Sequence, residues 1–297
     1  MNNHGFTLRL GPLGLHLRGD LDPAELPLPA RPFVDEPRED DLLVETQQFQ
    51  DRARQSPKGS DALSWRGERR GDELAFAAHA SPASPPLALA TLRPVGATLH
   101  RRPEDSRQVE PAWFNPLLQV LTAHAAPRRQ GLLLHAACVQ LRGRAWLLAG
   151  SSGSGKSTLA SALTRHGGHI LADDRSLVFA GPQPVACGTP WGGEPALKRA
   201  GTIALGGILF VQHADEDALL PLSPVAASAQ LLAVVLGLFW DRTLLDQAMA
   251  LACGLGGAGL CWRFRATVSG RAPECLLSLC DRLEDRRVRQ VTNEEAA

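Results

Sequence analysis

Apolar and polar positions along the chain follow two different patterns, which meet near residue 110. In the first half, apolar residues alternate loosely on both sides of Gly11-Pro12, as in a hairpin. Residues 22–40, rich in proline and acids, indicate a loop, and residues 41–57 are polar and irregular. Short strand-like runs follow at residues 62–65, 73–80 and 87–92. The pattern therefore predicts a smaller β-rich N-terminal region over residues 1–110.

The second half, residues 111–297, carries longer apolar runs in which expected strands and helices alternate, and this favours an α/β domain. A helix is expected from Pro111 to His124, and a β-hairpin over residues 132–149 turns at Arg142-Gly143. The next helix should end at Gly167-Gly168. Further strands are expected at residues 169–172, 207–212 and 259–268, and helices at 156–166, 224–240, 243–253 and 273–287.

A glycine-rich run between the hairpin and the helix at 156–166 fits the phosphate-loop pattern G-x-x-x-x-G-K-[ST] without a mismatch. Glycines let backbone N–H groups converge on an anion, and the start of the helix adds partial positive charge. Lys156 could then reach the β- and γ-phosphates of ATP, and Ser157 could hold Mg²⁺. The alternative is an accidental Gly/Ser loop. The residues expected to bind the nucleotide are Gly150, Ser151, Ser152, Gly153, Ser154, Gly155, Lys156, Ser157 and Thr158.

Asp173 and Asp174 follow a short strand, seventeen residues after Lys156. We expect them at the carboxyl end of a strand beside the one that leads into the loop, where α/β sheets gather ligands. One carboxylate could serve Mg²⁺ and the other could deprotonate a hydroxyl. The alternative for Asp174 is a helix N-cap. His135, in an apolar strand, is either a satisfied core residue or a hydrogen-bond partner of the acid pair or of the transferred phosphate.

Composition narrows the class of protein. Lys plus Arg and Asp plus Glu each number 31, so the zero net charge speaks against a partner that is nucleic acid. The six cysteines lack zinc or Cys-x-x-Cys spacing and are expected to be reduced core residues. The N-terminus lacks secretory-signal features, and the most apolar stretch, Leu231 to Trp240, is shorter than the roughly 20 residues that span a bilayer. A cytoplasmic protein with no membrane contact is expected.

The run from His135 to Asp174, HAACVQLRGRAWLLAGSSGSGKSTLASALTRHGGHILADD, resembles the catalytic core of HPr kinase/phosphorylase and its kinase relatives. A strand histidine, a hairpin into a phosphate loop, a glycine-ended helix and an Asp-Asp pair occur in the same order. The resemblance implies a phosphoenolpyruvate-carboxykinase-like P-loop core. It also implies that Asp173 is the catalytic base, that Asp174 is a metal or positioning acid, and that His135 and Lys156 belong to the site.

Residues 188–191 and 221–224 resemble, more loosely, divergent members of that family. Those members include lasso-peptide kinases that phosphorylate a serine of the precursor peptide. The Arg-Gly-Leu-Gly-Ile signature of true HPr kinases is absent, which speaks against HPr as the acceptor. Arg175, Arg199 and Glu194 are further candidates for the site, or else surface residues without a role. The family commonly assembles, which leaves a homo-oligomer open.

The expected function is an ATP- and Mg²⁺-dependent serine kinase that acts on a peptide or protein hydroxyl. A kinase of a small molecule such as free serine would use the same residues. A nucleotide-switched ATPase or binding module is a third alternative, against which stands the absence of the Leu-Ser-Gly-Gly-Gln and Asn-Lys-x-Asp motifs. A degenerate relative that only binds is the fourth, and the intact Lys156, Ser157, Asp173 and Asp174 speak against it.

Overall fold

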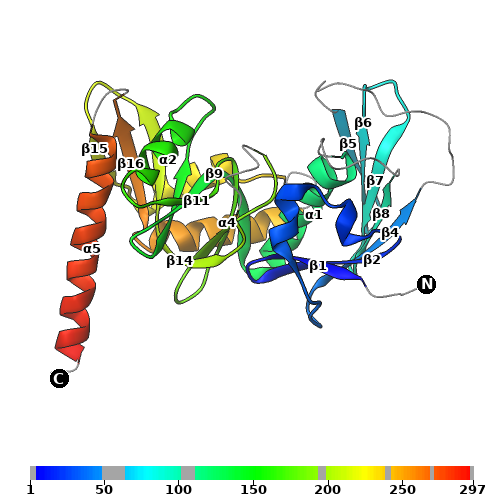
Figure 1. Ribbon diagram of the computed structural model, residues 1–297, viewed down its shortest axis with the longest axis horizontal. Helices are drawn as coiled ribbons and strands as arrows, with labels where there is room; N and C mark the ends of the chain where they lie inside the picture. Colours follow the sequence, from blue (N-terminus) through cyan, green and yellow to red (C-terminus); the bar gives the residue numbers. More distant parts are fainter. Residues whose placement is uncertain are drawn as a thin grey trace.

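The computed structural model describes residues 5–48, 64–101, 111–192, 199–237, 242–267 and 271–294. Over these residues the protein is a mixed α/β structure built on two large sheets of mixed strand direction. Figure 1 shows the first sheet at one end of the molecule and the second sheet, with most of the helices, at the other.

The first sheet has the strand order β3-β1-β2-β4-β8-β7-β6-β5. Its strands are β1 (Phe6–Leu10), β2 (Leu13–Gly19), β3 (Val34–Asp35), β4 (Leu42–Gln48), β5 (Ser64–Arg70), β6 (Glu73–His79), β7 (Pro86–Leu92) and β8 (Ala97–Arg101). The hairpin at Gly11-Pro12 is confirmed as the antiparallel pair β1–β2. Two 3-10 turns, Pro23–Glu25 and Leu28–Phe33, lie in the stretch expected to be a loop.

One expectation for this sheet is wrong. Residues 42–48, expected to be irregular, form β4, which lies parallel to both β2 and β8 in the middle of the sheet. Val44 and Thr46 are its buried positions, and polar residues alternate with them. A strand with so few apolar positions is stabilised by pairing with strands distant in the sequence, and local periodicity does not report that pairing. The rest of the 41–57 stretch from residue 49, and residues 62–63, lie outside the described residues.

The second sheet has the order β10-β9-β12-β13-β14-β16-β15, with β11 also paired to β9. Its strands are β9 (Gly131–Leu141), β10 (Arg144–Ala149), β11 (His169–Ala172), β12 (Arg175–Phe179), β13 (Val185–Gly188), β14 (Thr202–His213), β15 (Ala218–Pro221) and β16 (Cys261–Ala266). The helices are α1 (Gln119–Ala125), α2 (Lys156–Thr164), α3 (Pro224–Val234), α4 (Arg242–Gly257) and α5 (Ala272–Glu294). The hairpin β9–β10, with its turn at Arg142-Gly143, is confirmed.

Alternation along the strands divides the core of the second sheet into two layers. In β9, Leu134, Ala136 and Cys138 face the side covered by α3 and α4. Their neighbours Ala137 and Val139 pack with α2 and α5 on the other side. A third apolar layer joins the first sheet to α1 and to the adjoining end of the second sheet through Trp191. In β10, which leads into the glycine-rich loop, Leu147 belongs to the first of these layers and Leu148 to the second, so this strand is also buried on both faces.

Several expected helix ends shift. The helix expected from Pro111 becomes an irregular turn over Trp113–Leu118 before α1, because Asn115 precedes Pro116 and takes an extended conformation. α3 ends at Val234, since Val235 bridges to Leu134 of β9, and residues 238–241 and 268 lie outside the described part. α4 and α5 run beyond the expected ends at residues 253 and 287.

Candidate functional site

The glycine-rich loop spans residues 150–155 and joins the end of β10 to the first turn of α2 (Figure 1). Three of its glycines have positive φ: Gly150 at 148°, Gly153 at 77° and Gly155 at 95°. A Cβ atom at Gly150 would lie 2.6 Å from the backbone oxygen of Val211, so no other residue fits there without a shift. Ser151, Ser152 and Gly153 are exposed at the loop tip.

Lys156, the first residue of α2, turns its side chain back into the loop. Its Nζ donates to the backbone oxygens of Gly150 and Ser151, both at 2.9 Å. The side chain is largely buried, and this burial lowers its pKa from the usual 10.5; Asp174 raises the pKa, and Arg175 lowers it. The charges of Asp174 and Arg175 therefore act on the lysine of the loop.

Asp174 is held by two neighbours. Its Oδ1 lies 2.9 Å from Nδ1 of His135, and its Oδ2 lies 2.6 Å from a guanidinium nitrogen of Arg175. Burial raises the pKa of Asp174, but the His135 hydrogen bond and the charges of Arg175, His135 and Lys156 outweigh it, so the pKa lies below its usual value. Asp174 is therefore a stable carboxylate at neutral pH.

His135 and Arg175 lie side by side, because they are paired positions on the neighbouring antiparallel strands β9 and β12. The same Arg175 nitrogen approaches Nδ1 of His135 at 2.8 Å. Nδ1 cannot donate to the carboxylate and accept from the guanidinium at once. The guanidinium nitrogen can donate to Oδ2 of Asp174 at 2.6 Å instead, so we place the proton on Nδ1 of His135, which then donates to Oδ1 of Asp174. The side chains of His135, Asp174 and Arg175 are between 23% and 30% exposed, so the group is open to a ligand.

The acid pair sits differently from the expectation. β11 pairs with β9 rather than with β10, so the acids lie one strand further from the loop strand than expected. Asp173 and Asp174 form an irregular step between β11 and β12, where the Asp174 backbone oxygen accepts from the Ala136 N–H at 3.1 Å. A strand follows Asp174, which excludes the helix N-cap interpretation. Asp173 is half-buried at this step.

Of the two additional candidates among the described residues, Arg175 and Arg199, the structure brings Arg175 into contact with the acid pair. Arg199 is exposed, and its described contact here is a backbone hydrogen bond to Leu171 at 3.0 Å. Glu194 lies outside the described residues. Asp174 touches the segment before Glu194, since a Cβ atom at Gly192 would lie 2.5 Å from its Oδ2.

One residue of this site was not found from the sequence. His213, the last residue of β14, places its Nε2 atom 2.7 Å from the backbone oxygen of Gly153. β14 lies parallel to β10 and pairs Phe210 with Ala149, which brings the end of β14 level with the loop. The strand was expected to end at residue 212, and only the parallel pairing, which is not local, identifies His213.

Metal-ligating side chains do not gather into a larger group in the part of the chain that the structure describes. No group of three or more His, Cys, Asp and Glu side chains there could hold a metal ion by itself. The six cysteines are free thiols, four of them buried, and burial raises the pKa of Cys138 to about 12. The described helices also include none that is long and apolar enough to cross a membrane.

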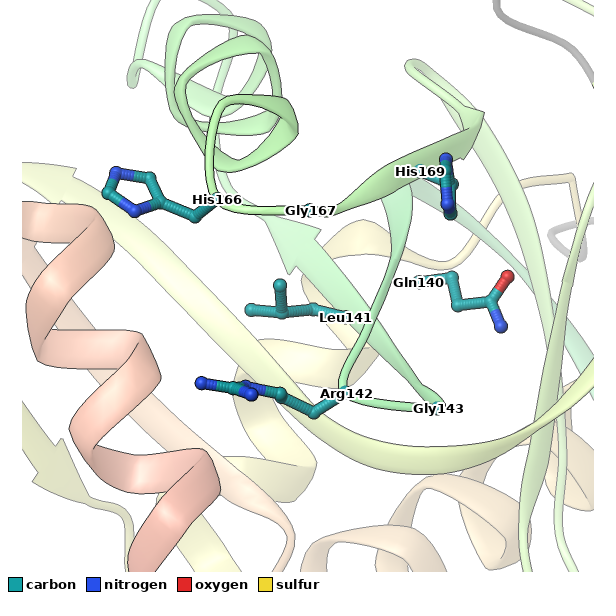
Figure 2. A pocket seen from close by; sticks show the side chains of 7 residues that line it. All are labelled: Gln140, Leu141, Arg142, Gly143, His166, Gly167 and His169. Atoms are coloured by element: carbon teal, nitrogen blue, oxygen red, sulfur yellow. The ribbon is translucent and has the colours of Figure 1, made fainter.

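A hollow of about 430 Å³ lies at the other end of α2 (Figure 2). Arg142, His166 and His169 are among the residues that line it. α2 has nine residues, so about 14 Å of helix separates this hollow from the loop. None of the predicted site residues lines it.

The fold and the loop define a mixed α/β protein with a glycine-rich loop at a strand–helix junction. The family model described as "SynChlorMet cassette protein ScmC" matches residues 103–254, just over half of the chain. The chain belongs to this ScmC family. The match takes in the glycine-rich loop, the acid pair and His213.

Among solved structures, the Hpr(Ser) kinase/phosphatase from Coxiella burnetii is similar to this chain at 13% identity and a TM-score of 0.31. The similarity covers 55% of this chain and 95% of that one. A likeness at that score does not establish a shared fold, so the phosphoenolpyruvate-carboxykinase-like core stays a prediction. No curated protein matches the chain.

Proposed function

We propose that this protein is a kinase that transfers the γ-phosphoryl group of ATP to a hydroxyl, with a serine of a peptide or protein as the preferred acceptor. The observation that carries the proposal is the glycine-rich loop with Lys156 turned into it and the Asp174 carboxylate in electrostatic contact with that lysine. Phosphoryl transfer depends mainly on positioning and charge stabilisation, which such a group supplies.

The residues present fit a nucleoside triphosphate with Mg²⁺. The loop combines positive-φ glycines, an exposed tip and the N-terminus of a nine-residue helix, a set that suits an anion. Ser157 is exposed in the first turn of α2 and could serve the metal. Each oxygen of Asp174 carries one contact, and a carboxylate oxygen has two lone pairs, so this residue keeps capacity for Mg²⁺ or its water shell. Bound Mg²⁺ would neutralise charge on the phosphates.

The proposed roles follow from these positions. The oxygen of the acceptor hydroxyl bonds to the γ-phosphorus, and Asp173 accepts the proton that this hydroxyl loses. The bond between the γ-phosphorus and the β–γ bridging oxygen breaks, which releases ADP. Lys156 and the loop N–H groups hold the phosphate oxygens. His135 and Arg175 position Asp174, because each contacts one of its carboxylate oxygens.

The test is a phosphotransfer assay read by mass spectrometry. The full chain is incubated with Mg-ATP and, separately, with serine-bearing peptides and with free serine. The variant Asp173→Asn removes the base, and Asp246→Asn, an exposed carboxylate on α4, is the matched control. We expect a phosphoryl mass gain on a peptide, an about 10³-fold lower rate in Asp173→Asn, and an unchanged rate in the control.

The remaining outcomes of this assay favour other functions or overturn the proposal. Transfer to free serine alone would identify a small-molecule kinase. ATP hydrolysis without transfer that survives in Asp173→Asn would overturn the base assignment and favour a nucleotide-switched module. A chain that binds no nucleotide at all would overturn the proposal.

A further inference from the structure

We infer that His213 is a positioning residue of the nucleotide site, which holds the glycine-rich loop in its phosphate-binding shape from the neighbouring strand. This inference rests on the proposed function, since it assigns a role within the same site. It starts from the 2.7 Å contact between the His213 Nε2 atom and the Gly153 backbone oxygen.

The direction of this hydrogen bond is fixed by its partner. A backbone oxygen only accepts, so Nε2 of His213 must carry the proton. Both the neutral Nε2–H tautomer and the charged imidazolium can donate in this way. The bond therefore persists whether or not the imidazole is charged.

The loop offers little else to hold this peptide in place. Gly153 has φ of 77°, and a Cβ atom built there would meet nothing within 4 Å. A glycine in open space pays the largest loss of backbone freedom when it is ordered. The imidazole also lies alongside Gly155, since a Cβ atom there would be 3.6 Å from the His213 Cε1 atom. His213 is thus the described side chain that restrains the outer side of the loop at Gly153.

The restraint reaches the inner side of the loop through one planar peptide group. In a trans peptide the Gly153 C=O and the Ser154 N–H point in opposite directions, so fixing one orients the other. The Ser154 N–H donates to the Ser151 oxygen at 3.2 Å, and Lys156 Nζ donates to the same oxygen at 2.9 Å. The Ser151 oxygen therefore accepts both from the peptide group that His213 restrains and from Lys156.

The geometry shows how β14 brings a donor to the loop. β10 ends at Ala149 and leads into the loop, and β14 continues three residues past the position paired with Ala149. That overhang places residue 213 beside the loop tip. His213 itself is exposed.

The test compares three variants of the full chain by calorimetric titration with Mg-ADP and Mg-ATP. His213→Ala removes the donor, and His213→Gln keeps an N–H donor that can reach about as far. His166→Ala, an exposed histidine beyond the far end of α2, is the matched control. We expect His213→Ala to bind nucleotide about five- to tenfold more weakly, the scale of one hydrogen bond, with the melting temperature unchanged. His213→Gln should restore most of the affinity, and His166→Ala should match the wild type.

Hydrogen exchange of the unliganded chain supplies a second measurement that does not need nucleotide. His213→Ala should speed exchange in the peptide that covers residues 150–158, and His213→Gln should not. If the wild type binds nucleotide and His213→Ala binds it equally well, the role of His213 is overturned and the proposed function is not. An equal loss in the Ala and Gln variants overturns the hydrogen bond as its cause. A wild type that binds no nucleotide overturns the proposed function, whereas faster loop exchange in His213→Ala would still support the contact.

Discussion

Two arginine–aspartate groups, one in each sheet, use the same chemistry in different surroundings. In the first sheet, Arg9 contacts both oxygens of Asp41, at 2.6 and 2.8 Å. In the second, Arg175 contacts one oxygen of Asp174 and leaves the other to His135. The Asp41 side chain is 2% exposed, against 30% for Asp174.

The pKa values do not separate the two groups. For both aspartates, burial raises the pKa, while hydrogen bonds and the charge of the neighbouring arginine outweigh it and lower the pKa overall. What differs is access and surroundings, since Asp174 is open to solvent and lies within electrostatic reach of the loop lysine. A lowered carboxylate pKa therefore indicates a well-paired acid, and only the adjoining glycine-rich loop makes one of the two pairs a candidate site.

The largest expected effect is a loss of phosphotransfer rate when the lysine of the glycine-rich loop is removed. Lys156→Ala should lower the phosphotransfer rate by about 10³-fold, because it removes a cation from the expected position of the phosphates. The melting temperature should change little, because burial lowers the pKa of Lys156 and so disfavours its charged form in the folded chain. Turnover and thermal unfolding of the purified variant measure both quantities.

The matching change in the first sheet is Arg9→Ala. It should lower the unfolding temperature and leave the rate per folded molecule as in the wild type, since the hydrogen-bond partners of Arg9 among the described residues are Asp35, Glu36 and Asp41, beside the first sheet. A rate loss in Arg9→Ala comparable to that of Lys156→Ala would erase the distinction between the two groups.

Arg101 gives the next largest effect, on stability alone. Its guanidinium is buried, 1% exposed, and contacts Glu25 at 2.8 Å, while it lies 5.9 Å from the ring centre of Trp113. Arg101→Met should lower the free energy of unfolding by about 3 kcal/mol, since it leaves Glu25 without its cation in a partly buried place. Urea unfolding measures the loss. Arg93→Met, which breaks an exposed pair with Glu73, should cost less than about 1 kcal/mol.

The site was predictable from the sequence to the extent that it is local. The glycine-rich loop, the strand before it and the helix after it are consecutive, so turn chemistry and periodicity identify them together. The contacts of Asp174 depend on the register that pairs His135 with Arg175, forty positions along the chain. His213 depends on a parallel pairing across some sixty positions. Neither pairing leaves a trace in the residues beside the motif.

The fold shows the same division. Hairpins such as β1–β2 and β9–β10 were predicted, because their pairing is set by the turn between them. β4 was missed, because its two parallel partners come from distant parts of the chain and its sequence is largely polar. Proline chemistry at Asn115-Pro116 was present in the sequence, and it accounts for the shorter first helix.

The smallest predicted effect tests the pKa of the buried aspartate, Asp41. The pKa of Asp41 in the folded chain lies below the usual 3.8, so the native state favours the ionised form. Its contribution to stability is therefore fully present above the unfolded pKa and is lost as the pH falls through the folded pKa. Asp41→Asn should cost about 2 kcal/mol at pH 7, the scale of a hydrogen bond to a charged group.

Urea unfolding of the wild type and Asp41→Asn between pH 7 and pH 3 follows this difference. It should stay constant down to about pH 5 and shrink below the usual carboxylate pKa, because the unfolded wild type then binds a proton that the folded chain takes up only at lower pH. Asp281→Asn is the control, since this exposed carboxylate lies 4.0 Å from Arg142 and should show a difference near zero throughout. A gap between wild type and Asp41→Asn that is unchanged at pH 3 would mean that shape and hydrogen bonding, rather than the charge of Asp41, hold the first sheet together at this point.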